Sequence, residues 1–267
     1  MTYKQLYGDI RSRLGDDASA YSLYLLQRPL PELLIDDNEV PADVLERHNN
    51  ASKRIEDGEP LQYVFGCAPF FDLIIDCGPG VLIPRFDTEV LVEEAIKTLP
   101  QNAVFADICC GSGCIAAAVL NSRKDTRAVC IDIFDTALYY TAKNLKKYGL
   151  SDRAELIKFD VFDDWADLPE VDCILCNPPY ITADEMKELP ENVKKEPYEA
   201  LYGGEDGLDF YRRILQASKD IFKGLPHIIF ETGYKQADDL RRMTNNKCEI
   251  KKDLSDNDRV CVIRGFL

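Results

Sequence analysis

The sequence contains no apolar run that approaches the ~20 residues a helix needs to cross a bilayer, so no membrane-spanning segment is expected. Its first residues, Met1 to Asp9, lack the basic stretch followed by an apolar stretch that marks a secretory signal. The 10 cysteines lie mostly within apolar runs, which is typical of reduced core residues rather than of a disulfide framework. Together these features predict a cytoplasmic protein.

The chain also lacks a dense block of Lys and Arg. It has 47 acidic and 32 basic residues, a formal net charge of −15 and a pI near 4.6. Its closest basic clusters, Lys194-Lys195 and Lys251-Lys252, are pairs flanked by acidic residues. A chain this acidic repels polyanions, so generic nucleic-acid binding is disfavoured, although a specific contact stays open.

Hydrophobic periodicity makes the N-terminal part of the chain helical. Leu6, Ile10 and Leu14 recur at helical spacing, and Val44 to Ile55 carry a second apolar face. No catalytic cluster occurs there, so we expect residues 1–66 to form a helical domain for substrate recognition. His48 lies on a helix face, where a histidine is more often structural than catalytic.

Residues 67–86 are predicted to form a β-hairpin linker. Alternation from Phe71 to Ile75 predicts the first strand, Cys77–Gly80 has the composition of a turn, and Val81–Ile83 is the predicted second strand. Asp87 is the predicted N-cap of the helix that follows.

From residue 103 onward, strands alternate with helices. Parallel strands are predicted at Ala103–Ile108, Arg127–Ile133, Ala154–Phe159, Val171–Cys176 and His227–Glu231, and helices at Cys114–Ser122, Thr136–Tyr148, Leu208–Phe222 and Gln236–Asn245. Two final strands, Cys248–Leu254 and Arg259–Phe266, are joined by a turn too short for a helical crossover, so they should be antiparallel. The pattern indicates an α/β fold in residues 87–267, with a doubly wound, mostly parallel sheet and an antiparallel edge hairpin.

The segment Asn177-Pro178-Pro179-Tyr180 directly follows the apolar run Val171–Cys176. Prolines cannot donate backbone hydrogen bonds, and Pro178 biases Asn177 towards an extended conformation, so a buried strand stops here in a stiff turn. In an open α/β sheet, ligands bind at this carboxyl edge. An amide, rigid rings and a phenol suit a planar polar group, although a turn that is merely rich in proline is the alternative at this point.

A second candidate site lies at the first strand-to-helix junction, Asp107-Ile108-Cys109-Cys110-Gly111-Ser112-Gly113. Glycines there let the backbone approach a ligand, and the helix N-terminus offers free N–H groups. Asp132 ends the second strand, where a ribose diol is usually held, and Asp160 follows the third, where it could accept a hydrogen bond from an adenine amino group. The turn is not G-x-G-x-x-G, because Cys109 replaces the first glycine, and it is not a P-loop. A nucleoside without phosphates therefore fits better than a dinucleotide.

Two other motifs have simpler explanations. Cys173-x-x-Cys176 has a zinc-like spacing, but it lies within a predicted core strand and has no second pair, so no metal site is expected. Glu205-Asp206-Gly207 is better explained as a capped helix start than as a substrate contact.

Taken in order, these features resemble an S-adenosylmethionine-dependent class I methyltransferase. Asn-Pro-Pro-Tyr narrows the resemblance to enzymes that methylate a nitrogen conjugated to a planar system. Further matching segments are Gly80–Arg85, Thr88-Glu89, Glu196-Pro197, Ala200–Leu208, Glu231-Thr232-Gly233 and Asp253–Val260. Over residues 60–267 the chain resembles the peptide chain release factor N5-glutamine methyltransferase family (PrmC/HemK). It departs from the family at Cys109-Cys110, where Gly-Thr is usual.

The resemblance implies a Rossmann-like class I methyltransferase domain that transfers a methyl group from S-adenosyl-L-methionine. The implied substrate is the glutamine amide of the Gly-Gly-Gln motif of bacterial class I release factors, and we expect the enzyme to be a monomer. The implied cofactor-binding residues are Asp107, Cys109, Cys110, Gly111, Ser112, Gly113, Asp132, Asp160, Val161 and Asn177. Asn177, Pro178 and Tyr180 would be catalytic, and Asn177, Pro178, Pro179 and Tyr180 would bind the amide.

Two alternatives compete with this interpretation. An adenine-N6 or guanine-N2 methyltransferase acting on nucleic acid can share Asn-Pro-Pro-Tyr, but the negative charge, the absence of a basic patch and the segment Gly203–Gly207 argue against it. A non-catalytic nucleoside-binding protein is the other alternative, and the intact Asn177, Pro178 and Tyr180 argue against lost chemistry.

Overall fold

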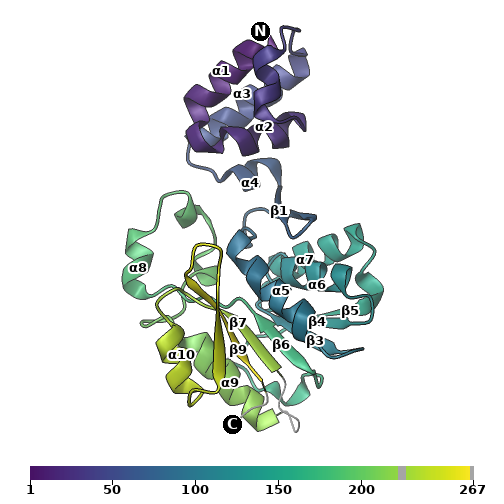
Figure 1. Cartoon of the computed structure of the whole chain (residues 1–267), viewed down its shortest axis with the longest axis vertical. Helices are drawn as coiled ribbons and strands as arrows, with labels where there is room; N and C mark the ends of the chain where they lie inside the picture. Colours follow the sequence, from purple (N-terminus) through teal and green to yellow (C-terminus); the bar gives the residue numbers. More distant parts are fainter. Residues whose placement is uncertain (222–226, 265–267) are drawn as a thin grey trace. The chain divides into compact units, whose positions relative to one another are not determined.

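The chain forms two compact units in a computed structural model that describes residues 1–221 and 227–264 (Figure 1). The smaller unit comprises Met1–Cys67 together with Pro190–Lys195, and the larger comprises Ala68–Leu189 together with Glu196–Leu267. Within the described ranges, no helix combines the length and the apolar character of a membrane span.

The smaller unit is a bundle of short helices. These are α1 (Tyr3–Leu14), α2 (Ala18–Leu26), α3 (Ala42–Glu56) and α4 (Leu61–Phe65), with 3-10 turns at η1 (Gly15–Asp17), η2 (Leu30–Ile35) and η6 (Val193–Lys195). Leu6, Ile10 and Leu14 are all buried, which confirms the helical spacing seen in the sequence. Thr2 caps α1, because its hydroxyl accepts a hydrogen bond from the Gln5 N–H.

His48 is buried inside this bundle and connects three helices. Its Nε2 lies 2.7 Å from Asp9 Oδ2 on α1, and its Nδ1 lies 2.9 Å from the Tyr21 hydroxyl on α2. Both ring nitrogens therefore have partners, and only 1% of the residue is exposed. This arrangement fits the structural role predicted for His48.

The larger unit is built on a seven-stranded sheet with the order β5-β4-β3-β6-β7-β9-β8. Its strands are β3 (Val104–Ile108), β4 (Arg127–Asp132), β5 (Ala154–Lys158), β6 (Cys173–Cys176), β7 (His227–Glu231), β8 (Cys248–Lys252) and β9 (Asp258–Ile263). Strands β3 to β7 run parallel to one another, whereas β9 is antiparallel to both β7 and β8. The predicted doubly wound sheet with an antiparallel edge hairpin is confirmed.

Helices cover both faces of this sheet. They are α5 (Glu89–Thr98), α6 (Cys114–Ser122) and α7 (Asp135–Lys147) on one face, and α9 (Asp209–Ile221) and α10 (Ala237–Met243) on the other. The short helix α8 (Ala183–Glu188) has no buried residues and belongs to neither layer. Short 3-10 turns occur at η3 (Phe86–Thr88), η4 (Ser151–Arg153), η5 (Trp165–Asp167) and η7 (Tyr198–Ala200).

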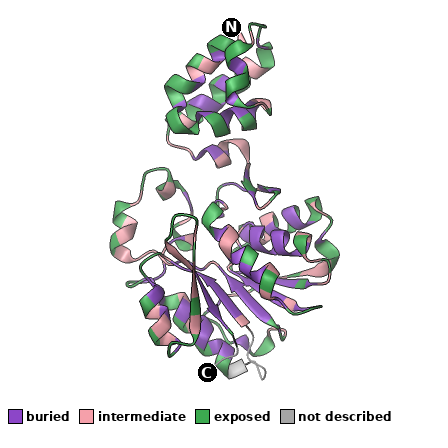
Figure 2. Cartoon of the chain, viewed as in Figure 1, coloured by how far each residue is buried: buried purple, intermediate pink, exposed green. Residues whose placement is uncertain are grey.

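Side-chain alternation along the strands produces two separate cores. Phe105, Cys173 and Leu175 point to the face covered by α5, α6 and α7. Ile174 and Cys176 point to the face covered by α9 and α10. Figure 2 shows the central strands buried along their length, as expected for a parallel sheet between helical layers.

The hairpin forms, but its turn and its strands lie earlier in the sequence than predicted. Its strands are β1 (Cys67–Phe70) and β2 (Leu73–Asp76), so the turn falls at Phe71-Asp72 rather than at Cys77–Gly80. Both turn residues have positive φ, at 44° and 59°. Val81–Ile83 is not a strand.

The prediction that Asp87 caps the next helix is also wrong. Asp87 lies inside η3, α5 begins at Glu89, and the Asp87 carboxylate pairs with Arg259 at 3.0 Å. The other predicted elements differ from those observed only at their ends. Two predicted end points, Phe222 and Phe266, lie outside the described residues.

Candidate functional site

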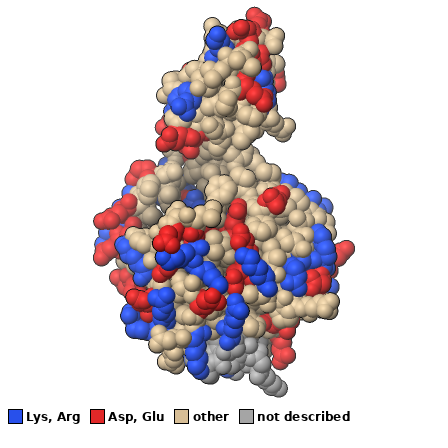
Figure 3. Space-filling view, in the orientation of Figure 1, with Lys and Arg blue, Asp and Glu red and all other residues tan. Residues whose placement is uncertain are grey.

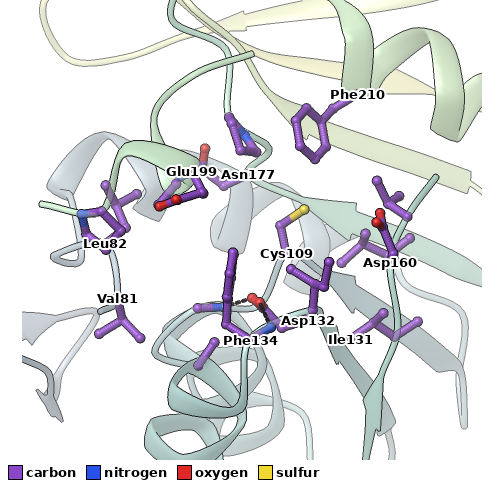
Figure 4. A pocket seen from close by; sticks show the side chains of 18 of the residues that line it. Val81, Leu82, Cys109, Ile131, Asp132, Phe134, Asp160, Asn177, Glu199 and Phe210 are labelled. Carbon is purple, nitrogen blue, oxygen red and sulfur yellow. Dashed lines mark hydrogen bonds between the residues drawn. The ribbon is translucent and has the colours of Figure 1, made fainter. Parts of the chain in front are cut away.

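A cavity of about 260 Å³ opens at the carboxyl ends of the parallel strands in the larger unit. Seven of the residues singled out from the sequence line it: Cys109, Gly111, Asp132, Asp160, Val161, Asn177 and Pro179. Figure 4 shows Asp132, Asp160 and Asn177 around this cavity, each at or just beyond the end of a different strand. The other six, Asp107, Cys110, Ser112, Gly113, Pro178 and Tyr180, are not among its lining residues.

The turn between β3 and α6 requires left-handed backbone at alternate positions. Cys109, Gly111 and Gly113 have φ of 59°, 55° and 73°. A Cβ at Gly113 would also lie 2.8 Å from the Thr141 side chain, so this glycine allows close packing of α6 against α7. Cys109 adopts a conformation that L-residues rarely use, which explains why glycine is favoured at such a position.

Cys110 and Ser112 brace this turn from behind. The Cys110 thiol lies 3.4 Å from Thr141 Oγ1, and Asn144 Nδ2 donates to the Ser112 carbonyl at 2.9 Å. Both residues are buried, so they hold the turn against α7 instead of facing the cavity.

Asp132 points its carboxylate back at the same turn. It accepts hydrogen bonds from the Gly111 N–H at 2.9 Å and the Phe134 N–H at 3.1 Å, drawn as dashed lines in Figure 4. Burial raises the pKa of Asp132 above its ordinary value, and the hydrogen bonds from backbone N–H groups oppose that rise. An oriented carboxylate at the end of β4 has the chemistry needed to accept from a ribose diol.

Asp107 is a buried carboxylate with unused hydrogen-bonding capacity. Its Oδ2 accepts from the Ala116 N–H at 3.0 Å, whereas Oδ1 is buried and has no hydrogen-bond partner within the described ranges. Burial raises the pKa of Asp107 to about 7, with Asp132 adding to the effect. A cationic ligand, such as one with an ammonium or sulfonium group, would relieve this penalty. The carboxylates of Asp107 and Asp132 therefore fit S-adenosylmethionine.

Aromatic side chains that were not predicted as site residues form much of the rest of the cavity wall. Phe134, Phe159, Phe162 and Phe210 line the cavity, and the rings of Phe162 and Phe210 meet edge to face at 5.1 Å. Such walls suit a flat heterocycle. The first three follow the ends of β4 and β5, which could have identified them, but Phe210 comes from α9 and carries no such signal.

The front of the cavity is built by two distant segments held together by one buried carboxylate. Val81 and Leu82 come from one of these segments, and Pro197, Glu199 and Ala200 from the other. Glu196 accepts from the Ile83 N–H at 2.9 Å and also pairs with Arg85. Val81 and Leu82 are therefore part of the cavity wall, which explains why the apolar character of this segment does not indicate a strand.

Asn177 and Tyr180 are anchored at opposite ends of their turn. Asn177 Nδ2 donates to Thr88 Oγ1 at 3.2 Å, and the Tyr180 hydroxyl donates to Glu231 Oε1 at 3.3 Å. Desolvation raises the pKa of Tyr180, and the nearby Glu231 adds to the rise, so the phenol stays neutral.

A glycine-rich segment supports this turn from outside the cavity. The Ile181 N–H donates to the Leu201 carbonyl at 2.9 Å, and the Gly203 N–H donates to the Ile181 carbonyl at 3.0 Å. A Cβ at Gly203 would lie 2.6 Å from the Pro179 carbonyl oxygen, so only glycine permits this approach. Asp206 accepts from the Leu208 N–H at 3.2 Å just before α9 begins, as expected for a capped helix start.

The two cysteines with zinc-like spacing cannot share a ligand. Cys173 belongs to the core beneath α5 to α7, and Cys176 belongs to the core beneath α9 and α10, on the opposite face of the sheet. Within the part of the chain that the structure describes, no group of three or more His, Cys, Asp or Glu side chains is arranged to hold a metal ion.

The fold and site define a methyltransferase. Residues 74–201 match a family model described as Methyltransferase small domain. Among solved structures, the hMettl16 catalytic domain in complex with MAT2A 3′UTR hairpin 6 is similar in fold, with a TM-score of 0.56, 20% identity, and coverage of 83% of this chain and 81% of that chain. The larger unit therefore has the class I methyltransferase fold.

Similarity at the sequence level extends further. A protein named release factor glutamine methyltransferase from Clostridium botulinum is 36% identical over 215 residues, which cover 78% of this chain and 76% of that protein. One of the same name from Aquifex aeolicus is 30% identical over 269 residues, 98% of this chain and 95% of the relative. The chain belongs to the release factor glutamine methyltransferase family, and it is an enzyme whose methyl donor is S-adenosylmethionine.

Proposed function

We propose that this enzyme methylates the side-chain amide nitrogen of the glutamine in the Gly-Gly-Gln motif of bacterial class I release factors. The observation that carries the proposal is the orientation of Asn177 at the cavity edge. Its Nδ2 is engaged by Thr88, so its Oδ1 is left to accept a hydrogen bond from a planar N–H donor. A glutamine amide is such a donor.

The cavity residues divide into ribose, methionine and adenine contacts in this proposal. Asp132 holds the ribose hydroxyls, the turn from Cys109 to Gly113 borders the methionine and ribose, and Asp160 with Val161 borders the adenine. Asp107 supplies negative charge behind the turn. These assignments are supported by the lining of the cavity and by the buried carboxylates described above.

Catalysis at an amide requires alignment more than activation. The amide nitrogen is a weak nucleophile, because its lone pair is delocalised into the carbonyl. Asn177 Oδ1 and the Pro178 carbonyl would accept its two N–H bonds and direct the nitrogen at the methyl group, while Tyr180 would stack on the amide plane. Well-oriented reactants gain roughly 7–11 kcal/mol, so positioning supplies most of the acceleration.

The reaction balances without a dedicated base. The amide nitrogen would form a bond to the methyl carbon as the carbon–sulfur bond breaks, and the electron pair of that bond would pass to the sulfur of the thioether product. The methylated nitrogen would then carry its two original protons and a positive charge, which makes these protons very acidic, and one of them would pass to water.

The helical N-terminal domain, residues 1–66, is the proposed recognition domain for the release factor. We also propose that residues 67–86 link it to the catalytic domain, that the enzyme acts as a monomer in the cytoplasm, and that nucleic acid is not its substrate. On the face of the molecule in Figure 3, Lys and Arg side chains of the larger unit are interspersed with Asp and Glu. That mixture, with the net charge of −15, supports a protein substrate over a polyanion.

Incubation with labelled S-adenosylmethionine tests the proposal. We expect label in an unmethylated class I release factor, and none when its motif glutamine is replaced by asparagine. Total RNA serves as the competing substrate, and label entering RNA alone would refute the proposal.

Asn177→Ala tests the assignment of the site within the same assay. We expect cofactor affinity to be retained and turnover to fall by at least roughly a hundredfold, because the amide loses its orientation. A proportional loss of both would show that Asn177 belongs to cofactor binding alone.

A further inference from the structure

A chain of hydrogen bonds behind the cavity connects both anchored residues of the Asn177–Tyr180 turn. Asn177 Nδ2 donates to Thr88 Oγ1 at 3.2 Å, and Thr88 Oγ1 donates to Glu231 Oε2 at 2.5 Å. The Tyr180 hydroxyl donates to the other carboxylate oxygen, Oε1, at 3.3 Å. One carboxylate therefore holds the two ends of the turn.

Thr88 and Glu231 are themselves shielded from solvent and from the cavity. Their exposed fractions are 2% and 1%, and neither is a lining residue. Thr88 ends η3 and Glu231 ends β7, so their contact joins segments far apart in the sequence. Any influence they have on the reaction must pass through Asn177 and Tyr180.

The direction of these hydrogen bonds follows from the charge of Glu231. An ionised carboxylate only accepts hydrogen bonds, so the single hydroxyl proton of Thr88 must point at Glu231. The lone pairs of Thr88 are then available only as acceptors, and they select the NH₂ end of the Asn177 amide. The oxygen end of Asn177 is left for the cavity.

We propose that Thr88 and Glu231 are positioning residues, which fix Asn177 with its oxygen towards the substrate amide and hold Tyr180 in place. The inference rests on the proposed function, because an accepting oxygen is useful only if the substrate presents an N–H group. We call the chain of hydrogen bonds from Glu231 through Thr88 to Asn177 the relay. If its direction were reversed, Asn177 would present its NH₂ group to the substrate NH₂ group, and the contact would be lost.

Protonation of Glu231 would remove the fixed direction, because a carboxylic acid can donate to Thr88. Burial raises the pKa of Glu231 to about 7, while the hydrogen bond from Thr88 and the Arg259 charge oppose the rise. The titratable and charged groups that act on it or respond to it are Asp87 from η3, Cys114 from α6, Tyr180 from the turn after β6, Tyr211 from α9 and Arg259 from β9. Arg259 is itself paired with Asp87 at 3.0 Å and Asp253 at 3.1 Å.

Three substitutions test the proposal in the full-length enzyme with release factor as substrate. Glu231→Gln keeps the shape but can donate to Thr88, and Thr88→Val keeps the volume but breaks the relay. We expect each to lower kcat roughly tenfold to a hundredfold while the affinity for S-adenosylmethionine, measured by calorimetry, stays within about twofold. Thr88→Ser restores the hydroxyl and should recover most of kcat.

The pH profile supplies a readout that a purely structural role would not change. The wild-type kcat should fall on the acid side with an apparent pKa near 7, and Glu231→Gln should lack that limb. Thermal unfolding of Glu231→Gln at pH 8 should occur no lower than in wild type, since the variant removes a buried charge.

Matched controls come from α5, away from the cavity. Thr98→Val removes a hydroxyl that donates to the Glu94 carbonyl, and Glu94→Gln neutralises a buried carboxylate paired with Arg264. Both should leave kcat unchanged. The double variant Thr88→Val with Glu231→Gln should be no slower than the slower single variant, because both break one relay.

Wild-type kcat in either Glu231→Gln or Thr88→Val overturns the inference, as does a parallel loss of cofactor affinity. Failure of the wild-type enzyme to methylate a release factor would instead refute the proposed function, so the two failures are distinguishable.

Discussion

Cys109 occupies a backbone conformation that suits glycine. With φ of 59° it places a Cβ where left-handed backbone costs an ordinary L-residue roughly 1–2 kcal/mol, and a β-branched residue more. We expect Cys109→Gly to fold and bind cofactor, and Cys109→Val to lower the free energy of unfolding by about 2 kcal/mol in urea denaturation. Cys67→Val in the extended strand β1 is the control, because Val is favoured in strands. Equal effects at the two positions would contradict the argument.

Gly203 is required for a different reason, the close approach of two backbones. An added Cβ would lie 2.6 Å from the Pro179 carbonyl oxygen and 2.7 Å from Tyr180 Cα, and neither atom can move without shifting the turn. Gly203→Ala should therefore lower kcat by at least about tenfold in a protein that still folds, measured in the release factor assay.

Gly8 provides the matched control for that substitution. It lies within α1, and an added Cβ would meet nothing within 4 Å. Gly8→Ala should raise the free energy of unfolding by about 0.5–1 kcal/mol and leave kcat unchanged. If Gly203→Ala behaved like Gly8→Ala, the packing of the loop against the turn would be irrelevant to catalysis.

At the residue scale, local sequence predicted the parts of the site that depend on chain neighbours. Asp132 ends one buried strand and Asn177 directly follows another, and a strand's carboxyl end reaches the ligand edge by topology. Thr88 and Glu199 could not be placed in the same way. Their positions depend on contacts with segments far along the chain, such as Thr88 with Glu231.

At the scale of elements, the β1–β2 hairpin shows how a strand can be predicted and its turn missed. Alternation located the strand near Leu73 and Ile75, but Gly-Pro-Gly drew the predicted turn to the wrong side of it. The real turn, Phe71-Asp72, uses positive φ at two residues that rarely adopt it. Packing of Phe71 against the core selects this turn over local propensity.

The same hairpin offers a stability test. Asp72 is exposed and has φ of 59°, so glycine would relieve its backbone strain without removing buried contacts. We expect Asp72→Gly to raise the free energy of unfolding by about 0.5–1 kcal/mol. Asp72→Val should lower it, because a β-branched residue resists positive φ. Thermal unfolding of the two variants gives the comparison, and a lower Tm for Asp72→Gly would refute the reasoning.

The order of strands was predictable only in part. Alternation of strands and helices implies parallel neighbours, and a short connection implies an antiparallel pair. The insertion of β9 between β7 and β8 does not follow from either rule. It arises because β9 carries the continuous apolar run Val260–Ile263, which is buried, whereas β8 is half polar and lies at the edge.

At the scale of the whole molecule, residues distant in the chain group together in ways that a linear argument does not anticipate. The helical character of the N-terminal part follows from its periodicity, but Pro190–Lys195 groups with that same unit. No local pattern in these residues predicts the grouping.

The whole molecule also carries buried carboxylates whose titration should govern its stability between pH 5 and pH 8. Burial raises the pKa of Asp107 and of Glu231 to about 7 in the folded state, from ordinary values of 3.8 and 4.5. A raised folded-state pKa means that folding favours the protonated form. The stabilisation is complete below the unfolded pKa and is lost as pH rises through about 7. Surface carboxylates with lowered pKa, such as Asp184, act in the opposite sense but titrate below pH 4.

We therefore expect the free energy of unfolding of the cofactor-free enzyme to fall as pH rises from 5 to 8, by roughly 1.4 kcal/mol for each unit of pKa difference. Asp107→Asn and Glu231→Gln should each flatten the profile measured by urea denaturation. S-adenosylmethionine carries positive charge, which offsets the ionised Asp107, so it should raise Tm more at pH 8 than at pH 6 at equal saturation. A profile that rises from pH 5 to pH 8 would show that other groups dominate. A variant profile as steep as wild type would show that the substituted carboxylate keeps its ordinary pKa in the folded enzyme.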